Sequence, residues 1–143
     1  MEGMMKIEIT TAPEKMDIEE IRTHLRIYNM PHLKDIFHTE VMCTTKDDSG
    51  NKMGGLVGEV WGEWLIVKFL WVDEKHQGQS IGSQLLVKAE NFAKSKGCHS
   101  SFLDTFSFQA KPFYERHGYK VKMKLDNFPI SGQRYYMVKS LSV

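Results

Sequence analysis

The stretch from Trp64 to Lys96 constrains the fold more than any other part of the chain. It opens with a long apolar run, Trp64–Val72, and passes through a loop that contains Gly78 and Gly82. The segment that follows has apolar residues at helical spacing, namely Ile81, Leu85, Leu86, Ala89, Phe92 and Ala93. A largely buried strand, a tight turn and an amphipathic helix in this order are typical of a crossover within a sheet. We therefore expect the helix to pack on a sheet, with the loop at the end of the strand.

The N-terminal third has weaker patterns. Lys6–Thr10 predicts a first strand, because apolar and polar residues alternate there. Asp17 and Glu20 form a capping-box pattern that predicts the start of a helix, and Pro31 should stop that helix just beyond Asn29.

Strand patterns dominate the rest of the chain. We expect the remaining strands at Phe37–Thr45, Met53–Val60, Ser101–Phe106, Tyr119–Leu125 and Arg134–Leu141, and a short helix at Ala110–His117. The predicted order is β-α-β-β-β-α-β-α-β-β, an α/β (α+β) fold in which helices flank a mixed, mostly antiparallel central sheet. No repeat or linker interrupts the chain, so a single domain over residues 1–143 is expected. Lys68, inside the most apolar strand, has no explanation at this stage.

Composition limits the function. The net charge is +1 with 41% hydrophobic residues, so we expect no nucleic-acid and no membrane partner. Cys43 and Cys98 have no metal or redox spacing and fit free thiols in a reducing compartment. The histidines show no paired spacing, so no metal is expected. The N-terminus lacks the apolar core of a signal peptide, and a cytoplasmic location follows as an expectation.

The loop Gln77–Ser83 is the candidate ligand site. It would direct the unpaired amides of the first helical turn, together with the helix dipole, at one point that suits a phosphate group. The alternative is that the glycines serve only the turn. No Gly-Lys-Ser/Thr ends the loop, and the three-glycine spacing of dinucleotide sites is missing.

Two segments carry a family resemblance. Gln77, Gly78, Gln79, Ser80, Ile81 and Gly82 resemble the acyl-CoA-binding motif Gln/Arg-x-x-Gly-x-Gly/Ala of the GNAT superfamily of N-acetyltransferases, with Ser80 in place of the middle glycine. Pro112–Tyr119 is similar to the family's Phe/Leu-Tyr-Glu-x-x-Gly-Phe/Tyr segment, and Ser107 stands where an asparagine is common. The run Asp104–Ala110 resembles a subgroup of small bacterial-type members. The resemblance implies the GNAT fold.

It also implies an activity and its site. The chain would transfer the acetyl group of acetyl-CoA, without a metal, to a primary amine by direct attack in a ternary complex. Tyr114 would be the general acid, since a phenol with a pKa near ~10 can protonate a departing thiolate. The implied cofactor-binding residues are Leu70, Trp71, Val72, Gln77, Gly78, Gln79, Ser80, Ile81, Gly82, Ser83, Ser107 and Gln109, of which Leu70, Trp71 and Val72 act through their backbone.

The remaining roles stay open. Candidates for a general base are Glu59, Glu63 and Asp104, with His99 and His117 as weaker ones. The acceptor, a small-molecule or a protein amine, would meet Tyr28, His32, Phe128, Tyr135 and Tyr136. A homodimer is possible through the last strands. Rival hypotheses are an acetyl-CoA sensor without turnover and a nucleotide-binding domain of another class.

Overall fold

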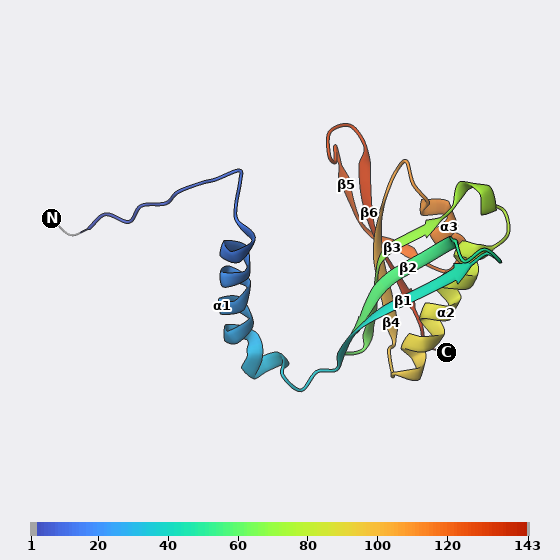
Figure 1. The fold of residues 1–143 in the computed structure, drawn as a ribbon, viewed down its shortest axis with the longest axis horizontal. Helices are drawn as coiled ribbons and strands as arrows, with labels where there is room; N and C mark the ends of the chain where they lie inside the picture. Colours follow the sequence, from blue (N-terminus) through green and yellow to red (C-terminus); the bar gives the residue numbers. More distant parts are fainter. Residues whose placement is uncertain (1–2, 143) are drawn as a thin grey trace. The chain divides into compact units, whose positions relative to one another are not determined.

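The computed structural model describes residues 3–142, and Figure 1 labels their helices and strands. The contacts of the chain divide it into two units, Met1–Ile36 and Phe37–Val143, which are described separately. Whether they act as one domain stays a prediction. No helix within the described residues is long and apolar enough to cross a membrane.

The N-terminal unit consists of one helix, α1 (Lys15–Leu33), preceded by an irregular segment. The strand predicted at Lys6–Thr10 is wrong, because these residues form no regular secondary structure. The capping-box prediction is also wrong. The helix begins at Lys15 after Glu14, and Asp17 lies inside its first turn. Pro31 does not stop α1 at Asn29, and the amide of Lys34 still donates to the carbonyl of Met30 at 2.9 Å.

The second unit is built on one six-stranded sheet. Its strands are β1 (His38–Lys46), β2 (Lys52–Trp61), β3 (Trp64–Val72), β4 (Ser100–Phe106), β5 (Lys120–Asp126) and β6 (Gln133–Ser140). The order across the sheet is β1-β2-β3-β4-β6-β5. Neighbouring strands are antiparallel except for the parallel pair β3–β4. The mixed, mostly antiparallel sheet is therefore confirmed, with six strands instead of seven.

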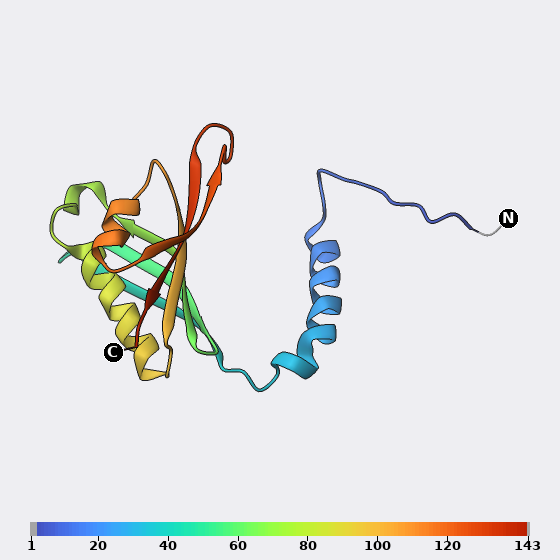
Figure 2. The same ribbon diagram turned by 180° about the vertical axis from the view of Figure 1, so that it is seen from behind.

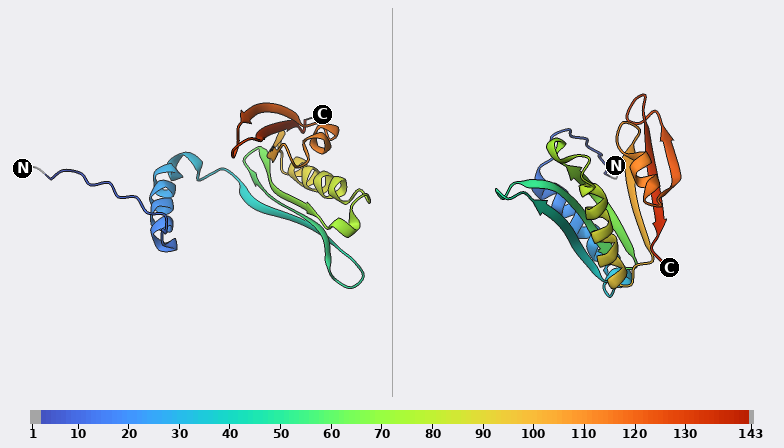
Figure 3. Two further views of the ribbon diagram at one scale, coloured as in Figure 1. Left: turned by 90° about the horizontal axis from the view of Figure 1, so that it is seen from above. Right: turned by 90° about the vertical axis from the view of Figure 1, so that its right-hand side faces the viewer.

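Helices occupy the connections that follow β3 and β4. They are η1 (Glu74–His76) and α2 (Ile81–Ser95) after β3, and α3 (Lys111–Arg116) after β4. Seen from behind, α2 runs along the sheet from the β3 end (Figure 2). Figure 3 shows α2 between the β1–β3 half and the β4–β6 half of the twisted sheet.

The core lies between α2 and the inner face of the sheet. On α2 the buried apolar residues are Ile81, Leu85, Leu86, Ala89 and Ala93, and on the strands they include Leu56, Val60, Leu65, Val67, Leu103 and Met137. Phe92, which the helical spacing placed on this face, is 37% exposed, and Glu90 is 3% exposed instead. The α2 helix therefore buries a carboxylate.

That buried carboxylate is fully engaged. Lys139 Nζ lies 2.7 Å from Glu90 Oε1, and the hydroxyl of Tyr119 donates to Oε2 at 2.9 Å. Ser101 Oγ is 2.7 Å from the same hydroxyl and can donate to it. Removing one partner would leave a buried charge uncompensated. The network therefore ties α2 to β4, to β6 and to the residue that precedes β5.

A bulge in β3 opens the sheet. Val57 pairs with Phe69 and Gly58 pairs with Val67, so Lys68 has no partner in the register. A bulge bends its strand and increases the twist. Pairing of β3 with β4 ends at Ile66, opposite Phe102, so the second halves of these strands part. The bulge explains how a lysine fits into this apolar strand, because Lys68 is the residue that the bulge leaves outside the regular pairing. Its ammonium group lies 3.1 Å from Glu59 Oε2.

The bulge also limits how much of β3 is buried. Only Leu65 and Val67 are buried, whereas Phe69 and Trp71 are 67% and 51% exposed. The expectation of a largely buried strand is therefore wrong for the half that follows the bulge.

Gly58 makes the bulge possible, which can be tested. A Cβ at this position would lie 2.4 Å from the backbone oxygen of Ile66. We expect Gly58→Ala to lower the free energy of unfolding by about 1–3 kcal/mol through overpacking, measured by chemical denaturation. Gly55→Ala is the matched control on the same strand, since its Cβ would meet its nearest neighbours at 3.6 Å. Equal losses in the two variants would contradict a special role for Gly58.

Candidate active site

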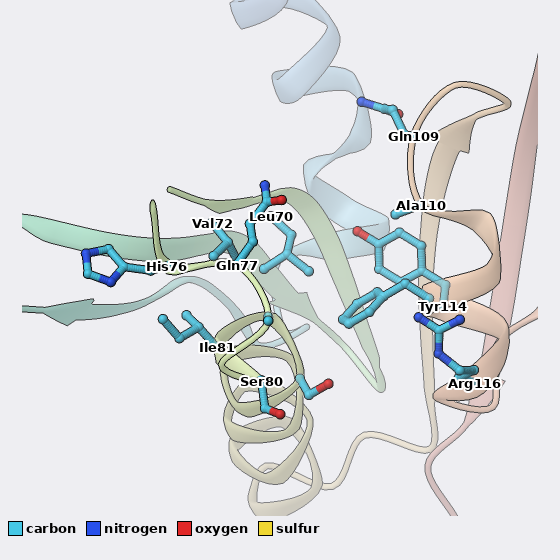
Figure 4. Close-up of a pocket in the computed structure, with 14 residues that line it drawn as sticks. Leu70, Val72, His76, Gln77, Ser80, Ile81, Gln109, Ala110, Tyr114 and Arg116 are labelled. Atoms are coloured by element: carbon cyan, nitrogen blue, oxygen red, sulfur yellow. The ribbon is translucent and has the colours of Figure 1, made fainter. Parts of the chain in front are cut away.

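A cavity of about 640 Å³ lies where the loop after β3 faces α3 (Figure 4). Its volume is in the usual range of small-molecule sites. Leu70 and Val72 of β3 form one wall, the loop and the start of α2 form a second, and Phe113, Tyr114 and Arg116 of α3 form a third. The fold thus brings together two motifs that are distant in the sequence.

Most of the predicted cofactor-binding residues line this cavity. They are Leu70, Val72, Gln77, Gly78, Ser80, Ile81, Gly82, Ser83 and Gln109. Trp71, Gln79 and Ser107 do not line it. The side chain of Ser107 instead accepts a hydrogen bond from the backbone amide of Gln133 at 3.2 Å. The assignment of these residues to cofactor binding stays a prediction.

The loop backbone takes an unusual path at Ser80. This residue has φ +61° and ψ +22°, in the left-handed region that favours glycine. The α2 helix begins directly after it at Ile81, and the side chain of Ser80 makes no capping bond. The first-turn amides of α2, at Ile81, Gly82 and Ser83, therefore have no partner within the helix. An anion in this cavity could accept hydrogen bonds from them.

Hydrogen bonds fix two side chains of the cavity lining, those of Ser83 and Gln109. Ser83 Oγ lies 2.8 Å from His117 Nε2, which links the first turn of α2 to the end of α3. Burial, together with Lys139 and Arg116, outweighs the attraction of Glu90 and lowers the pKa of His117, so its ring is neutral at pH 7. The Oε1 atom of Gln109 accepts from the amide of Phe106 at 2.9 Å, which leaves the NH₂ group of Gln109 as the part that a ligand could use.

Tyr114 is only 8% exposed. Burial, and secondly the charge of Asp104, raise the pKa of its phenol above the ordinary value. Phe113 and Tyr119 pack edge-on against its ring at 5.2 and 5.9 Å, which restricts its orientation. In Figure 4 the hydroxyl points across the cavity toward Leu70. Tyr114 is therefore a protonated, oriented hydroxyl at pH 7.

A second cavity of about 700 Å³ lies between the parted halves of β3 and β4. It shares four lining residues with the first cavity, namely Leu70, Gln109, Ala110 and Tyr114. The two cavities therefore meet at Tyr114. Trp71, expected to contact the cofactor, lines this second cavity instead.

The proposed bases lie in different surroundings. Glu59 lines neither cavity. Although burial opposes its charge, the hydrogen bonds from His38 and Lys68 prevail and lower its pKa, which makes it a weak proton acceptor. Glu63 lies 3.3 Å from His99, which also lines neither cavity. Asp104 lines the second cavity, and its Oδ2 atom accepts from Nε and Nη2 of Arg134 at 2.8 and 2.7 Å.

The aromatic residues expected around the acceptor have other partners. Phe128 and Tyr136 pack on the guanidinium of Arg134, at 5.1 and 5.2 Å from their ring centres, and Tyr135 lies 5.0 Å from Lys111 Nζ. None of the three lines either cavity. Tyr28 and His32 belong to α1 of the N-terminal unit, and their role stays a prediction.

Sequence reasoning missed four lining residues of the first cavity, which are His76, Ala110, Phe113 and Arg116. Arg116 is the most informative, because it brings a permanent positive charge to the wall that faces the loop amides. In Figure 4 its side chain lies on the α3 side of the cavity, next to Tyr114. The sequence signal that could have identified Arg116 is a basic residue at one of the unspecified (x) positions of the Pro112–Tyr119 motif. No cluster of metal-ligating side chains occurs within residues 3–142, and the lack of a metal stays a prediction.

The strained backbone of Ser80 leads to a stability prediction. A non-glycine residue in the left-handed region costs about 1–2 kcal/mol. We expect Ser80→Gly to raise the free energy of unfolding by about 1 kcal/mol, measured by chemical denaturation. The control is Ser49→Gly, at an exposed turn position outside the positive-φ residues, which should be neutral or destabilising. A loss of stability in Ser80→Gly would show that the serine side chain holds the loop.

Comparisons with known proteins agree with this architecture. Residues 38–121 match the family model described as an acetyltransferase (GNAT) domain. The chain is 39% identical over 95 residues to blasticidin-S acetyltransferase of Streptomyces morookaense, covering 66% of this chain and 70% of that protein. It is 35% identical over 99 residues to an acetyltransferase of Agrobacterium fabrum, covering 69% and 72%.

A solved structure extends the match to nearly the whole chain. The crystal structure of an acetyltransferase from Bacillus cereus is similar to this chain with a TM-score of 0.81 and 34% identity, over 93% of this chain and 97% of that one. The fold, the two facing motifs and these relatives lead to one conclusion: the chain is an enzyme of the GNAT family of acetyltransferases.

Proposed function

We propose that the enzyme transfers the acetyl group of acetyl-CoA to the amino group of a small molecule, by direct attack within a ternary complex. The observation that carries this proposal is the meeting of the two cavities at Tyr114. One cavity would hold the donor and the other the acceptor, so that the thioester and the amine come together beside one protonated phenol.

The donor side has the groups that a coenzyme A diphosphate requires. The first-turn amides of α2 and the dipole of that helix face the cavity from one side, and Arg116 faces it from the other. Leu70 and Val72 supply an apolar wall, along which the pantetheine arm would lie. A backbone amide of Leu70, Trp71 or Val72 would polarise the thioester carbonyl.

The chemistry of the lining supports direct attack. The lone pair of the neutral amine forms the new bond to the carbonyl carbon, the C–S bond breaks, and the thiolate takes a proton from Tyr114. The proton that the amine nitrogen then loses returns to the phenolate of Tyr114, directly or through water. Neither Cys43 nor Cys98 lines either of the two cavities at Tyr114. Burial raises the pKa of both Cys43 and Cys98, which keeps them as thiols. These features support a mechanism without an acyl-enzyme.

The kind of acceptor is supported by the relatives. One of them is named for blasticidin S, which favours a small-molecule amine over a protein. A homodimer through β5, the outer strand beside β6, and a cytoplasmic location are parts of the same proposal. An acetyl-CoA sensor is the alternative, and thiol release separates the two, since a sensor binds the cofactor and releases no thiol when amines are added.

Tyr114→Phe tests the acid role. We expect kcat to fall by about 100-fold or more while the Kd for acetyl-CoA stays within about twofold. Tyr135→Phe, which removes a hydroxyl outside both cavities, should leave kcat unchanged. Because the pKa of Tyr114 is raised, its acid form persists through pH 9, and the loss should be similar at pH 7 and pH 9. An unchanged kcat in Tyr114→Phe would remove this residue from the mechanism.

Arg116→Gln tests the donor site. Loss of one charge contact near the surface should weaken acetyl-CoA binding by about fivefold, measured by calorimetry. Lys122→Gln makes the same charge change on β5, outside the cavity, and should have no effect. Titration with dephospho-coenzyme A, which lacks the 3′-phosphate, identifies the phosphate that Arg116 contacts. If Arg116→Gln weakens the binding of both ligands, the contact is with the diphosphate. If it weakens only the binding of acetyl-CoA, the contact is with the 3′-phosphate. Unchanged binding of both ligands would exclude Arg116 from the site.

A further inference from the structure

We infer that the acceptor is a monoamine attached to a flat conjugated ring, with the ring against Phe69 and Trp71 and the amino group beside Asp104. The inference rests on the proposed function, since it takes the second cavity as the acceptor site. It adds the substrate class, which the family membership leaves open.

The walls of the second cavity are aromatic. Phe69 and Trp71 on β3 face Phe102 and Phe106 on β4 across the region where these strands part. Phe69 and Trp71 lie two residues apart on the same strand, so their side chains share one face of the sheet. Both side chains are more than half exposed. Flat rings that stack on such side chains gain energy beyond the burial of area.

The polar end of the cavity is rigid. Two nitrogen atoms of Arg134 hold Oδ2 of Asp104, and the guanidinium is packed against the rings of Phe106, Phe128 and Tyr136 at 5.5, 5.1 and 5.2 Å. No hydrogen bond within residues 3–142 uses Oδ1 of Asp104. This oxygen can therefore accept a hydrogen bond from an amino group, and Arg134 acts as its positioning residue.

The charges of the lining select against polycations. Lys68 and Arg134 contribute two positive charges and Asp104 contributes one negative charge. The partner of Lys68, Glu59, lies outside the lining. A polyamine would thus meet no surplus of carboxylates, and its additional ammonium groups would be repelled by like charges. Because Asp104 is the single carboxylate of this lining, a second amino group would find no acidic partner there.

The amino group would also lie in the correct place for transfer. Asp104 and Tyr114 both line the second cavity, and Tyr114 also lines the first. An amine held by Asp104 is therefore near the point where the two cavities meet. Asp104 thus combines acceptor recognition with the geometry of attack.

Binding to the protein loaded with coenzyme A tests the inference independently of turnover. The probes are 2-phenylethylamine, its saturated counterpart 2-cyclohexylethylamine, and spermidine, each measured by calorimetry. We expect the flat amine to bind at least about fivefold more tightly than the other two. Tighter binding of spermidine or of the saturated amine, or no binding of the flat amine, would overturn the inference.

Variants locate the binding. Trp71→Ala should weaken binding of 2-phenylethylamine by about threefold to tenfold, whereas Trp61→Ala, on β2 outside the cavity, should not. Asp104→Asn should reduce the preference for 2-phenylethylamine over 2-phenylethanol. Equal effects of the two tryptophan variants, or a change only in self-association measured by ultracentrifugation, would show that Trp71 serves a protein interface and would contradict the inference.

Thiol release from acetyl-CoA separates this inference from the proposed function. Binding of 2-phenylethylamine without thiol release would show that the cavity binds this class of amine. It would also contradict the proposed acetyl transfer. Thiol release with spermidine in preference to the flat amine would support the transferase and overturn the substrate class.

Discussion

The parting of β3 from β4 is the constraint on which the site depends. The bulge at Lys68 ends the parallel pairing at Ile66 and Phe102, and the two cavities lie beside the strands beyond that point. A regular strand would continue the pairing and close this space. Gly58 permits the bulge, because any side chain there would meet the backbone of Ile66. Gly58, which lines neither cavity, therefore determines where the two cavities can form.

A buried hydrogen-bond network holds the helices beside this opening. The buried network of Glu90, Lys139, Tyr119 and Ser101 fixes α2 against the strands and places Tyr119 against Tyr114. Because the charge of Glu90 is paired within the core, loss of a partner would be costly. The network thus links α2, which begins at the loop, to Tyr114 on α3.

Sequence reasoning could predict the strand–loop–helix unit, because apolar periodicity and glycine positions are local signals. It could also place Tyr114 through a short motif. It failed where a partner far along the chain decides the outcome. Glu90 lies four residues after Leu86 on the inner face, yet its burial depends on Lys139 and Tyr119. Lys6–Thr10 has the alternation of a strand but forms no regular secondary structure, because alternation over five residues does not by itself determine a strand. Trp71 lines the other cavity because a bulge, invisible in the residue pattern, turns the strand.

The central claim is that coenzyme A binds between the start of α2 and α3. Amide chemical shifts of the isotope-labelled protein, followed during titration with coenzyme A, test it most directly. The account predicts the largest changes at Ser80–Ser83 and Leu70–Val72, and small changes at the turn between β5 and β6. No change at the start of α2, or changes confined to another surface, would contradict it.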